Sequence, residues 1–289
     1  MNTAAVIIVS IAYVWFIVPA ALSVLQYAFG SARRSLLVGV WTVLVGVALP
    51  CMRQLSSHNV VPHIVLRKGY HLLALALFIP ALRWEPTLLQ LAFAAAFALL
   101  AAAELLRVLD VPSISCRISV FMHSFTDARD SGAFLVSHFC LLLGIAGPIL
   151  ATTLASNDVI PAGSVSLVHA NPPLACWSGL LSLGVADTIA AAVGTAVGRV
   201  RIHKSSRKTL EGTLAAAVCM YVCMLALQAF EIVGARSGEL FDRIWDWEAL
   251  CRLCRMAWYT LLTCWLEAVT DQLDNIVFPL HCMTLFALL

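Results

Sequence analysis

The sequence predicts an all-α protein, a polytopic transmembrane helix bundle of about nine spans, and three observations lead to this prediction. Hydrophobic residues make up 61% of the chain and charged residues only 12%. In soluble domains, about 45–50% of the residues are apolar and about 25% are charged. The mean hydropathy is +0.91. The apolar residues also form long stretches, many of them near the roughly 20 residues that a helix needs to cross a bilayer. These stretches and short loops fill the 289 residues, so we expect no separate soluble domain.

Nine apolar stretches, separated by polar segments, are the predicted spans. In order, they are residues 4–29, 36–51, 71–82, 88–106, 132–154, 174–197, 214–233, 250–265 and 276–289. The second, third, eighth and ninth are short for a full crossing, so a tilted helix, longer flanks or a re-entrant segment are alternatives there. We interpret residues 1–66 as N-terminal transmembrane helices and residues 67–289 as one continuous membrane domain that contains the chemistry.

The loops between the predicted spans differ in charge. If all nine stretches cross the membrane, the loops after the second, fourth, sixth and eighth share one side. These loops contain most of the Lys and Arg residues, including all three lysines. The positive-inside rule therefore predicts that this side is cytoplasmic, with Arg33 and Arg34 as exceptions on the other side. The net charge is only +2 and no basic run is interleaved with aromatic residues, so we expect no nucleic-acid partner.

Asp187 lies well inside the sixth apolar stretch. A carboxylate at the centre of a transmembrane helix costs about 2.5–3.5 kcal/mol on insertion scales, so ionisable residues there are candidates for a functional role. The alternative is an aspartate near enough to the helix end to reach the headgroups or to pair with a basic neighbour. Gly194 and Gly198 follow at G-x-x-x-G spacing, which by itself indicates close helix packing.

A basic segment, residues 199–213, follows this stretch and ends at the start of the next span. Its Lys and Arg side chains suit the phosphates of a nucleoside triphosphate. The free N–H groups at the N-terminus of the next helix, together with the hydroxyl of Thr209 or Thr213, also favour an anion. Taken alone, the segment would equally fit an ordinary positive-inside loop.

Asp271 and Asp274 lie between the last two apolar stretches. At i, i+3 spacing they share a helix face, which is the arrangement that two carboxylates need to hold one divalent cation. Glu267, one turn earlier, could join them. The alternative is a polar connecting turn, although these acids would repel each other without a cation or a basic partner.

Two further polar clusters lie on the predicted cytoplasmic side. Residues 127–132 open the fifth span, where Asp130 fits a helix cap. Asp127 and Arg129 are not needed for capping, so they are candidates for activating a lipid hydroxyl or contacting phosphate. Residues 67–71 enter the third span with more cationic groups, which could also be interfacial side chains that reach the headgroups.

Five motifs, in their order and spacing, resemble those of the dolichol kinases. They are Arg67-Lys68-Gly69-Tyr70-His71, Asp127-Ala128-Arg129-Asp130-Ser131-Gly132, Gly184-Val185-Ala186-Asp187-Thr188, Lys208-Thr209-Leu210-Glu211-Gly212-Thr213 and Asp271-Gln272-Leu273-Asp274-Asn275. The resemblance extends from about residue 67 to the C-terminus. The stretch from Asp187 to Thr213 is also similar to the nucleotide-binding signature of the phosphatidate cytidylyltransferases, and both families use CTP.

The resemblance to dolichol kinases implies a multi-pass enzyme of the endoplasmic reticulum membrane with its active-site loops in the cytoplasm. Such an enzyme transfers the γ-phosphoryl group of CTP to the terminal hydroxyl of dolichol, a polyisoprenoid alcohol. The products are CDP and dolichyl phosphate, the lipid carrier for protein glycosylation.

The same resemblance implies a role for each group of residues. Asp130 or Asp127 would orient or deprotonate the lipid hydroxyl, and Arg129 would hold the phosphoryl group. Mg²⁺ or another divalent cation would be held by Asp187, Asp271 and Asp274. Binding of CTP is expected at Arg67, Lys68, His71, Lys204, Arg207, Lys208, Thr209, Glu211, Gly212 and Thr213.

Three alternative functions are weighed against this one. A kinase for phytol or another short prenol would use the same residues. A phosphatidate cytidylyltransferase would share the CTP site and release pyrophosphate, but no Pro-Gly-His-Gly-Gly-like segment precedes Asp271. A transporter would explain Asp187, yet the other polar residues lie in loops on one side instead of lining a path across the bilayer.

Overall fold

The structure is a computed structural model of the chain, and it describes residues 18–57, 63–110, 114–123, 134–155, 173–203, 208–234, 247–270 and 274–289. Within these ranges the backbone is helical, apart from short turns and one isolated antiparallel bridge between Arg201 and Thr209. The all-α prediction is therefore confirmed.

A helix is present at the position of each of the nine predicted stretches. In chain order, the helical segments are α2 (Val18–Phe29), α3 (Ala32–Ser57), α4 (His63–Trp84), α5 (Pro86–Val108), α6 (Ser115–His123), α7 (Ser137–Ala155), the 3₁₀-helix η2 (Leu174–Trp177), the π-helix η3 (Leu180–Ala186), α8 (Asp187–Val197), α9 (Leu210–Gly234), α11 (Trp247–Val269) and α12 (Asp274–Phe286). The short helix α6 was not predicted, because its nine residues mix polar and apolar side chains without a long apolar run.

The predicted count of about nine spans is not confirmed. Among the described residues, five helices are long and apolar enough to cross a membrane. They are Ala32–Leu55, Pro86–Val108, Ser137–Leu154, Leu180–Val197 and Leu210–Ala229. Helices α4 and α11 have the length but include several charged residues, and the apolar helices α2 and α12 are shorter.

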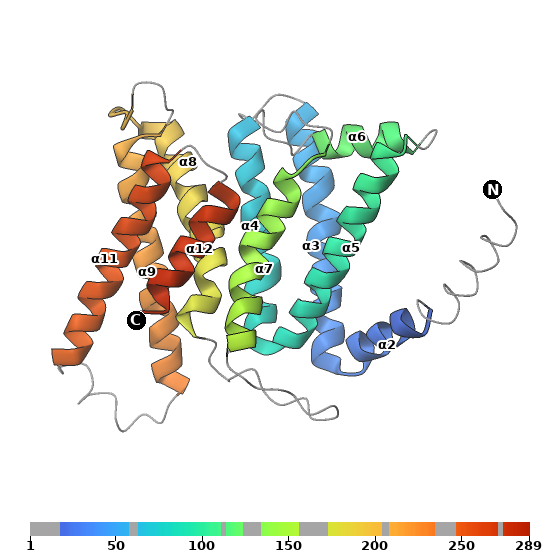
Figure 1. Cartoon of the computed structure of the whole chain (residues 1–289), viewed down its shortest axis with the longest axis horizontal. Helices are drawn as coiled ribbons and strands as arrows, with labels where there is room; N and C mark the ends of the chain where they lie inside the picture. Colours follow the sequence, from blue (N-terminus) through green and yellow to red (C-terminus); the bar gives the residue numbers. More distant parts are fainter. Residues whose placement is uncertain are drawn as a thin grey trace, which may run out of the picture.

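The helices run alternately up and down, so that their ends gather at two opposite ends of the bundle (Figure 1). Helices α3, α5, α8 and α11 end at the top of that view, and α4, α7, α9 and α12 begin there, with α6 lying across the same end. We call this the site end. The sequence predicted that the loops after alternate spans share one side, and the described helix ends agree with it. The side of the membrane that the site end faces stays a prediction.

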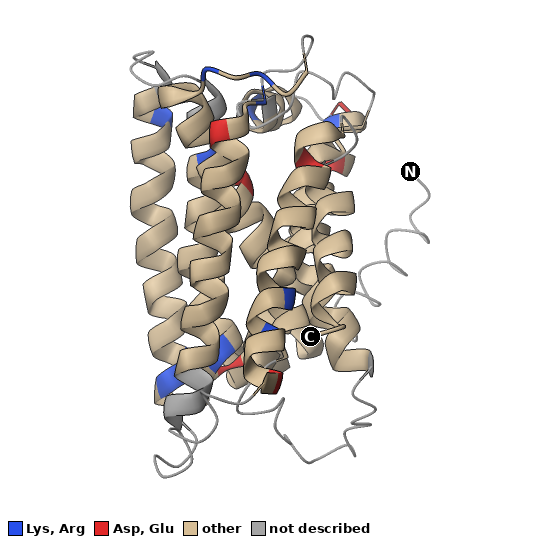
Figure 2. Ribbon diagram, turned by 90° about the vertical axis from the view of Figure 1, so that its left-hand side faces the viewer, with Lys and Arg blue, Asp and Glu red and all other residues tan. Residues whose placement is uncertain are grey.

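The exterior of the bundle is apolar between its two ends. Lys, Arg, Asp and Glu gather toward the ends, and the middle consists almost entirely of other residues (Figure 2). Large apolar side chains point outward from the long helices, including Leu99, Leu154 and Val218, which are 72%, 80% and 63% exposed. Water would solvate such a surface poorly, whereas lipid tails suit it. The chain is therefore a multi-pass membrane protein.

The interior is packed around η3, which contacts α4, α7, α8, α9 and α12. Side chains that are almost completely buried in this core include Leu183, Met220, Met224 and Met256. The packing is close enough to exclude a methyl group at Gly144 of α7. A Cβ there would collide with the carbonyl oxygen of Asn275, at the start of α12, and would lie 2.9 Å from the side chain of Leu183. Gly144 thus sets the position of the N-terminal end of α12.

We expect Gly144→Ala to lower the free energy of unfolding by roughly 1–3 kcal/mol, because the added methyl group meets backbone that cannot move aside without shifting α12. Gly147→Ala in the same helix is the matched control, since a Cβ at Gly147 has no atom within 4 Å. Alanine also favours the helix by about 1 kcal/mol over glycine, so this control should be as stable as wild type or more stable. Unfolding of the two variants in detergent would measure the difference, and equal stability would contradict the close packing.

Candidate active site

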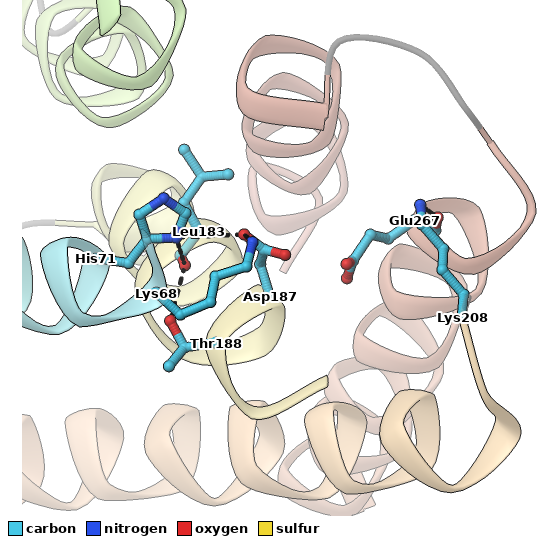
Figure 3. A network of polar contacts seen from close by, with 7 residues as sticks. All are labelled: Lys68, His71, Leu183, Asp187, Thr188, Lys208 and Glu267. Atoms are coloured by element: carbon cyan, nitrogen blue, oxygen red, sulfur yellow. Dashed lines mark hydrogen bonds and ion pairs between the residues drawn. The ribbon is translucent and has the colours of Figure 1, made fainter. Parts of the chain in front are cut away.

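The candidate site lies at the site end, where the first turns of α4 meet the junction of η3 and α8. The π-helix η3 (Leu180–Ala186) ends directly at Asp187, the first residue of α8. π-Helical segments are rare and occur frequently at functional sites. Helix α4 packs tightly on this segment, because a Cβ on Gly184 would collide with the side chain of Leu75. This packing brings the start of α4 next to Asp187 (Figure 3).

His71 connects α4 to the π-helix. Its Nδ1 lies 3.1 Å from the carbonyl oxygen of Leu183 and 3.2 Å from Oδ2 of Asp187. Both partners are acceptors, so Nδ1 carries the proton in these hydrogen bonds. The hydroxyl of Thr188 donates a long hydrogen bond of 3.5 Å to the same Leu183 carbonyl. His71 therefore fixes the Asp187 carboxylate relative to the backbone of η3.

Lys68, one turn before His71, forms an ion pair with the same carboxylate. Its Nζ donates to Oδ2 of Asp187. The side chains of Lys68 and Asp187 are only 14% and 11% exposed. The pairing with a basic residue, one of the alternatives that the sequence left open for Asp187, is therefore present, and the functional role of this buried carboxylate stays a prediction.

The described parts of the basic segment after α8, residues 199–203 and 208–209, pair with each other just before α9, and we call these two paired stretches the hairpin. The N–H of Ile202 donates to the carbonyl of Lys208 at 3.1 Å, and the N–H of Leu210 donates to the carbonyl of Val200 at 2.8 Å. The carboxylate of Glu211 accepts the N–H of Val200 through both of its oxygens, at 3.1 and 3.2 Å. Glu211 thus holds the start of the hairpin against the first turn of α9.

Small residues let α8 and α9 approach closely at this hairpin. Cβ atoms on Gly194 and Gly198 would lie 2.9 and 2.7 Å from the hydroxyl oxygen of Thr209, and a Cβ on Gly212 would lie 2.5 Å from the carbonyl oxygen of Ala190. The packing role that the sequence indicated for Gly194 and Gly198 is confirmed.

Thr209 and Thr213 are buried at the start of α9. The N–H of Gly212 donates to the hydroxyl of Thr209 at 3.3 Å, which makes Thr209 an N-cap. The hydroxyl of Thr213 donates to the carbonyl of Thr209 at 3.0 Å. The first turn of α9 is thus ordered by its own side chains, and the predicted contacts of both threonines with a nucleotide stay predictions.

Lys208 connects the hairpin to the end of α11. Its Nζ donates to the carbonyl oxygens of Glu267 and, at 2.9 Å, of Thr270. A cationic side chain at the last carbonyls of a helix stabilises that end. Glu267 itself is buried, and its carboxylate points toward the Lys68–Asp187 pair (Figure 3).

Glu267 was named in the sequence analysis as a residue that could join Asp271 and Asp274, but it was left out of the assigned site. The sequence placed it one turn before Asp271 but did not include it among the predicted ligands. The available signal was an acidic residue in the last turn of an apolar helix, where it opposes the helix dipole and needs compensation from a cation.

A second buried ion pair orders the segment that leads toward the predicted catalytic residues. Arg107 donates to both oxygens of Glu104, at 2.6 and 2.9 Å, and Glu104 also accepts the N–H of Leu135 at 2.7 Å. Glu104 therefore joins the end of α5 to the residues just before α7. Arg107 follows Glu104 by three residues in α5, so this ion pair joins adjacent turns of one helix.

Several predicted site residues cannot be placed by the described part of the chain. Arg67 lies on α4 and Asp274 begins α12, but the structure describes only their backbone and not their side chains. Entirely outside the described residues are Asp127, Arg129, Asp130, Lys204, Arg207 and Asp271. The structure does bring Lys68, His71 and Asp187 together, with Lys208 on the neighbouring hairpin.

The described residues provide part of the ligand set for a divalent cation at Asp187, and the metal itself stays a prediction. No three His, Cys, Asp or Glu side chains within the described ranges converge as a complete ligand set. The partners of the buried Asp187 carboxylate are nevertheless cationic or protonated groups, so this position already stabilises positive charge. Carboxylate oxygens are the ligands that Mg²⁺ prefers, and Glu267 faces the same space.

Comparison with known proteins gives relatives of one kind. No family model matches the chain, and no solved structure matches it. The chain is 35% identical to the dolichol kinase EVAN of Arabidopsis thaliana over 267 residues, which are 92% of this chain and 42% of that protein. It is 29% identical to human dolichol kinase over 270 residues, 90% of this chain and 46% of the human protein.

A third relative is the dolichol kinase sec59 of Schizosaccharomyces pombe, at 29% identity over 76% of this chain and 38% of that protein. The chain spans less than half the length of these relatives. The resemblance to dolichol kinases found in the sequence motifs is confirmed, and the similarity to a CTP-binding signature stays a prediction.

Proposed function

We propose that this chain, a relative of dolichol kinases, catalyses CTP-dependent phosphorylation of dolichol. It would transfer the γ-phosphoryl group of CTP to the terminal hydroxyl of the lipid and release CDP and dolichyl phosphate. The observation that carries this proposal is the 35% identity to a dolichol kinase over 92% of the chain. A buried, charged site at the end of an apolar bundle supports it.

The location of the site suits both substrates. Dolichol keeps its chain among the lipid tails, so its hydroxyl reaches a protein only near the headgroups, whereas CTP arrives from water. The site end lies where the apolar exterior gives way to charged residues (Figure 2). All three lysines lie in the loops of this end or beside them, which favours a cytoplasmic orientation in the endoplasmic reticulum membrane.

The residues divide the reaction between them. Phosphoryl transfer depends mostly on positioning and charge stabilisation. Lys208 of the hairpin would bind the triphosphate together with Lys204 and Arg207 of the same basic segment. Further contacts would come from Thr209, Gly212 and Thr213. Arg67, Lys68 and His71 at the start of α4 would contact the nucleotide from the other side. Glu211 would contact the ribose or the metal.

The acceptor and the metal would be held by acidic residues. The oxygen of the lipid hydroxyl attacks the γ-phosphorus, the bond from this phosphorus to the β-phosphate oxygen breaks, and the hydroxyl proton passes to Asp130 or Asp127. Arg129 would hold the phosphoryl group during transfer. Asp187, Asp271 and Asp274 would hold Mg²⁺ or another divalent cation, which supplies charge neutralisation on the phosphates when it is bound.

Position-labelled CTP distinguishes this function from the alternatives. With purified protein and dolichol, we expect the label of γ-labelled CTP in the lipid and the label of α-labelled CTP in CDP. Phytol and phosphatidate serve as competing acceptors under the same conditions. A preference for phytol would change the substrate to a shorter prenol. Transfer of the α-label to a lipid phosphate, with release of pyrophosphate, would replace the kinase with a cytidylyltransferase.

A further inference from the structure

The ion pair between Lys68 and Asp187 occupies the carboxylate that the proposed function gives to a metal ion. The two residues are 119 positions apart in the sequence and come from different helices, α4 and α8. Both side chains are nearly buried. A buried carboxylate without a cationic partner is costly, so Asp187 needs positive charge next to it whether or not a metal is bound.

We propose that Lys68 is a built-in counter-ion of Asp187 and that a divalent cation displaces it: the ammonium group and the metal exchange at the same carboxylate. The inference rests on the proposed function, because it takes Asp187 as a metal ligand. In the ligand-free protein, Lys68 neutralises the carboxylate and keeps the junction of η3 and α8 folded. When the metal binds, repulsion between the two cations moves Lys68 away.

Lys68 and His71 contact Asp187 in different ways, and the difference makes Lys68 the mobile partner. His71 donates to Asp187 and is also anchored to the Leu183 carbonyl, which belongs to the rigid core. Within the described part of the chain, the ammonium group of Lys68 donates to Asp187, and this contact has no second anchor like the one that holds His71. Its four-carbon side chain can swing while the backbone of α4 stays in place. The released ammonium group would then be free to meet a phosphate of the incoming nucleotide, which brings negative charge to the site.

Metal binding without nucleotide or lipid tests the exchange directly. Titration of the purified full chain with Mn²⁺, followed by electron paramagnetic resonance, gives the dissociation constant. We expect Lys68→Met to bind Mn²⁺ about tenfold more tightly than wild type or better, because the competing charge is gone. Lys68→Arg keeps the charge and should bind no more tightly than wild type. Asp187→Asn should lose the site. If Lys68→Met binds Mn²⁺ as tightly as wild type or more weakly, the ion pair between Lys68 and Asp187 is permanent and the exchange is wrong.

A measurement on the wild-type chain covers the case in which Lys68→Met does not fold. An amine-reactive label, located by mass spectrometry, should modify Lys68 slowly in EDTA and several-fold faster with saturating Mn²⁺. Lys208 is the internal control, because its ammonium group donates to the backbone carbonyls of Glu267 and Thr270. Unchanged or slower labelling of Lys68 on metal binding would overturn the proposal.

Failure of the exchange and failure of the proposed function give different results. A chain that binds Mn²⁺ and releases Lys68, but phosphorylates no lipid alcohol, keeps the exchange and loses the kinase function. If the chain phosphorylates dolichol while neither metal affinity nor Lys68 labelling responds as expected, the kinase function stands and the exchange is wrong. A wild-type chain that binds no Mn²⁺ at Asp187 also overturns the exchange.

Discussion

Asp187→Asn should abolish lipid phosphorylation, with kcat lower by at least about a thousandfold, because it removes a proposed metal ligand while keeping the size of the side chain. The structure adds an effect on stability. Lys68 would face a neutral amide in a nearly buried position, so the free energy of unfolding should fall by about 1–3 kcal/mol. Initial rates with saturating CTP and dolichol, together with thermal unfolding in detergent, measure both effects.

Two further variants separate these effects. Lys68→Met combined with Asp187→Asn removes both charges, so stability should return toward wild type while activity stays lost. Asp110→Asn is the matched control at the same end of the bundle. Asp110 has a positive φ of 48°, which asparagine also tolerates, and it accepts a hydrogen bond from Ser115 that an amide oxygen can keep. Near-normal turnover in Asp187→Asn would reduce Asp187 to a structural partner of Lys68.

Lys208→Met should raise the KM for CTP by at least about tenfold, with a smaller change in kcat, because a cation that binds phosphate acts in the ground state as well as the transition state. Lys208 also donates to the last carbonyls of α11, so stability should fall by about 1 kcal/mol. The measurement is the rate as a function of CTP at saturating dolichol.

Lys208→Arg tests whether Lys208 acts mainly by binding CTP or mainly by holding the end of α11. A guanidinium group can still donate to two carbonyl oxygens, so this variant should keep the stability of wild type and recover much of the CTP affinity. Arg201→Met removes a charge from the same hairpin and is the control for a general loss of positive charge, which should change the KM for CTP less than Lys208→Met. If Lys208→Met lowers stability and kcat together and leaves the KM for CTP unchanged, Lys208 acts only by positioning the end of α11.

The sequence by itself determined the class of the fold and indicated the kind of reaction that we propose. Apolar stretches of this length must be helical, because a backbone in lipid has to satisfy its own hydrogen bonds. The alternation of the loops then placed the basic segment and the start of α4 at one end of the bundle. The five motifs carried the resemblance to dolichol kinases, since their residue types and order are visible without any coordinates.

The number of spans was not determined by the apolar pattern. Charged residues inside α4 and α11 and the shortness of α2 and α12 leave five described helices that meet the length and hydropathy of a crossing. Hydropathy reports how well a segment partitions into lipid, whereas a helix inside a bundle can hide its polar side chains against neighbouring helices.

Only the tertiary structure decided which polar groups meet. The sequence suggested Lys68 and His71 as phosphate ligands, yet both contact Asp187, and Lys208 holds the end of α11, some 60 residues away. Such pairs depend on how helices dock and rotate against each other, and this is set by close contacts such as Gly144 against Asn275 and Gly184 against Leu75. The π-helix before Asp187 likewise depends on packing. The same sequence stretch could form an α-helix or a π-helix with little difference in local energy, so its neighbours decide between the two.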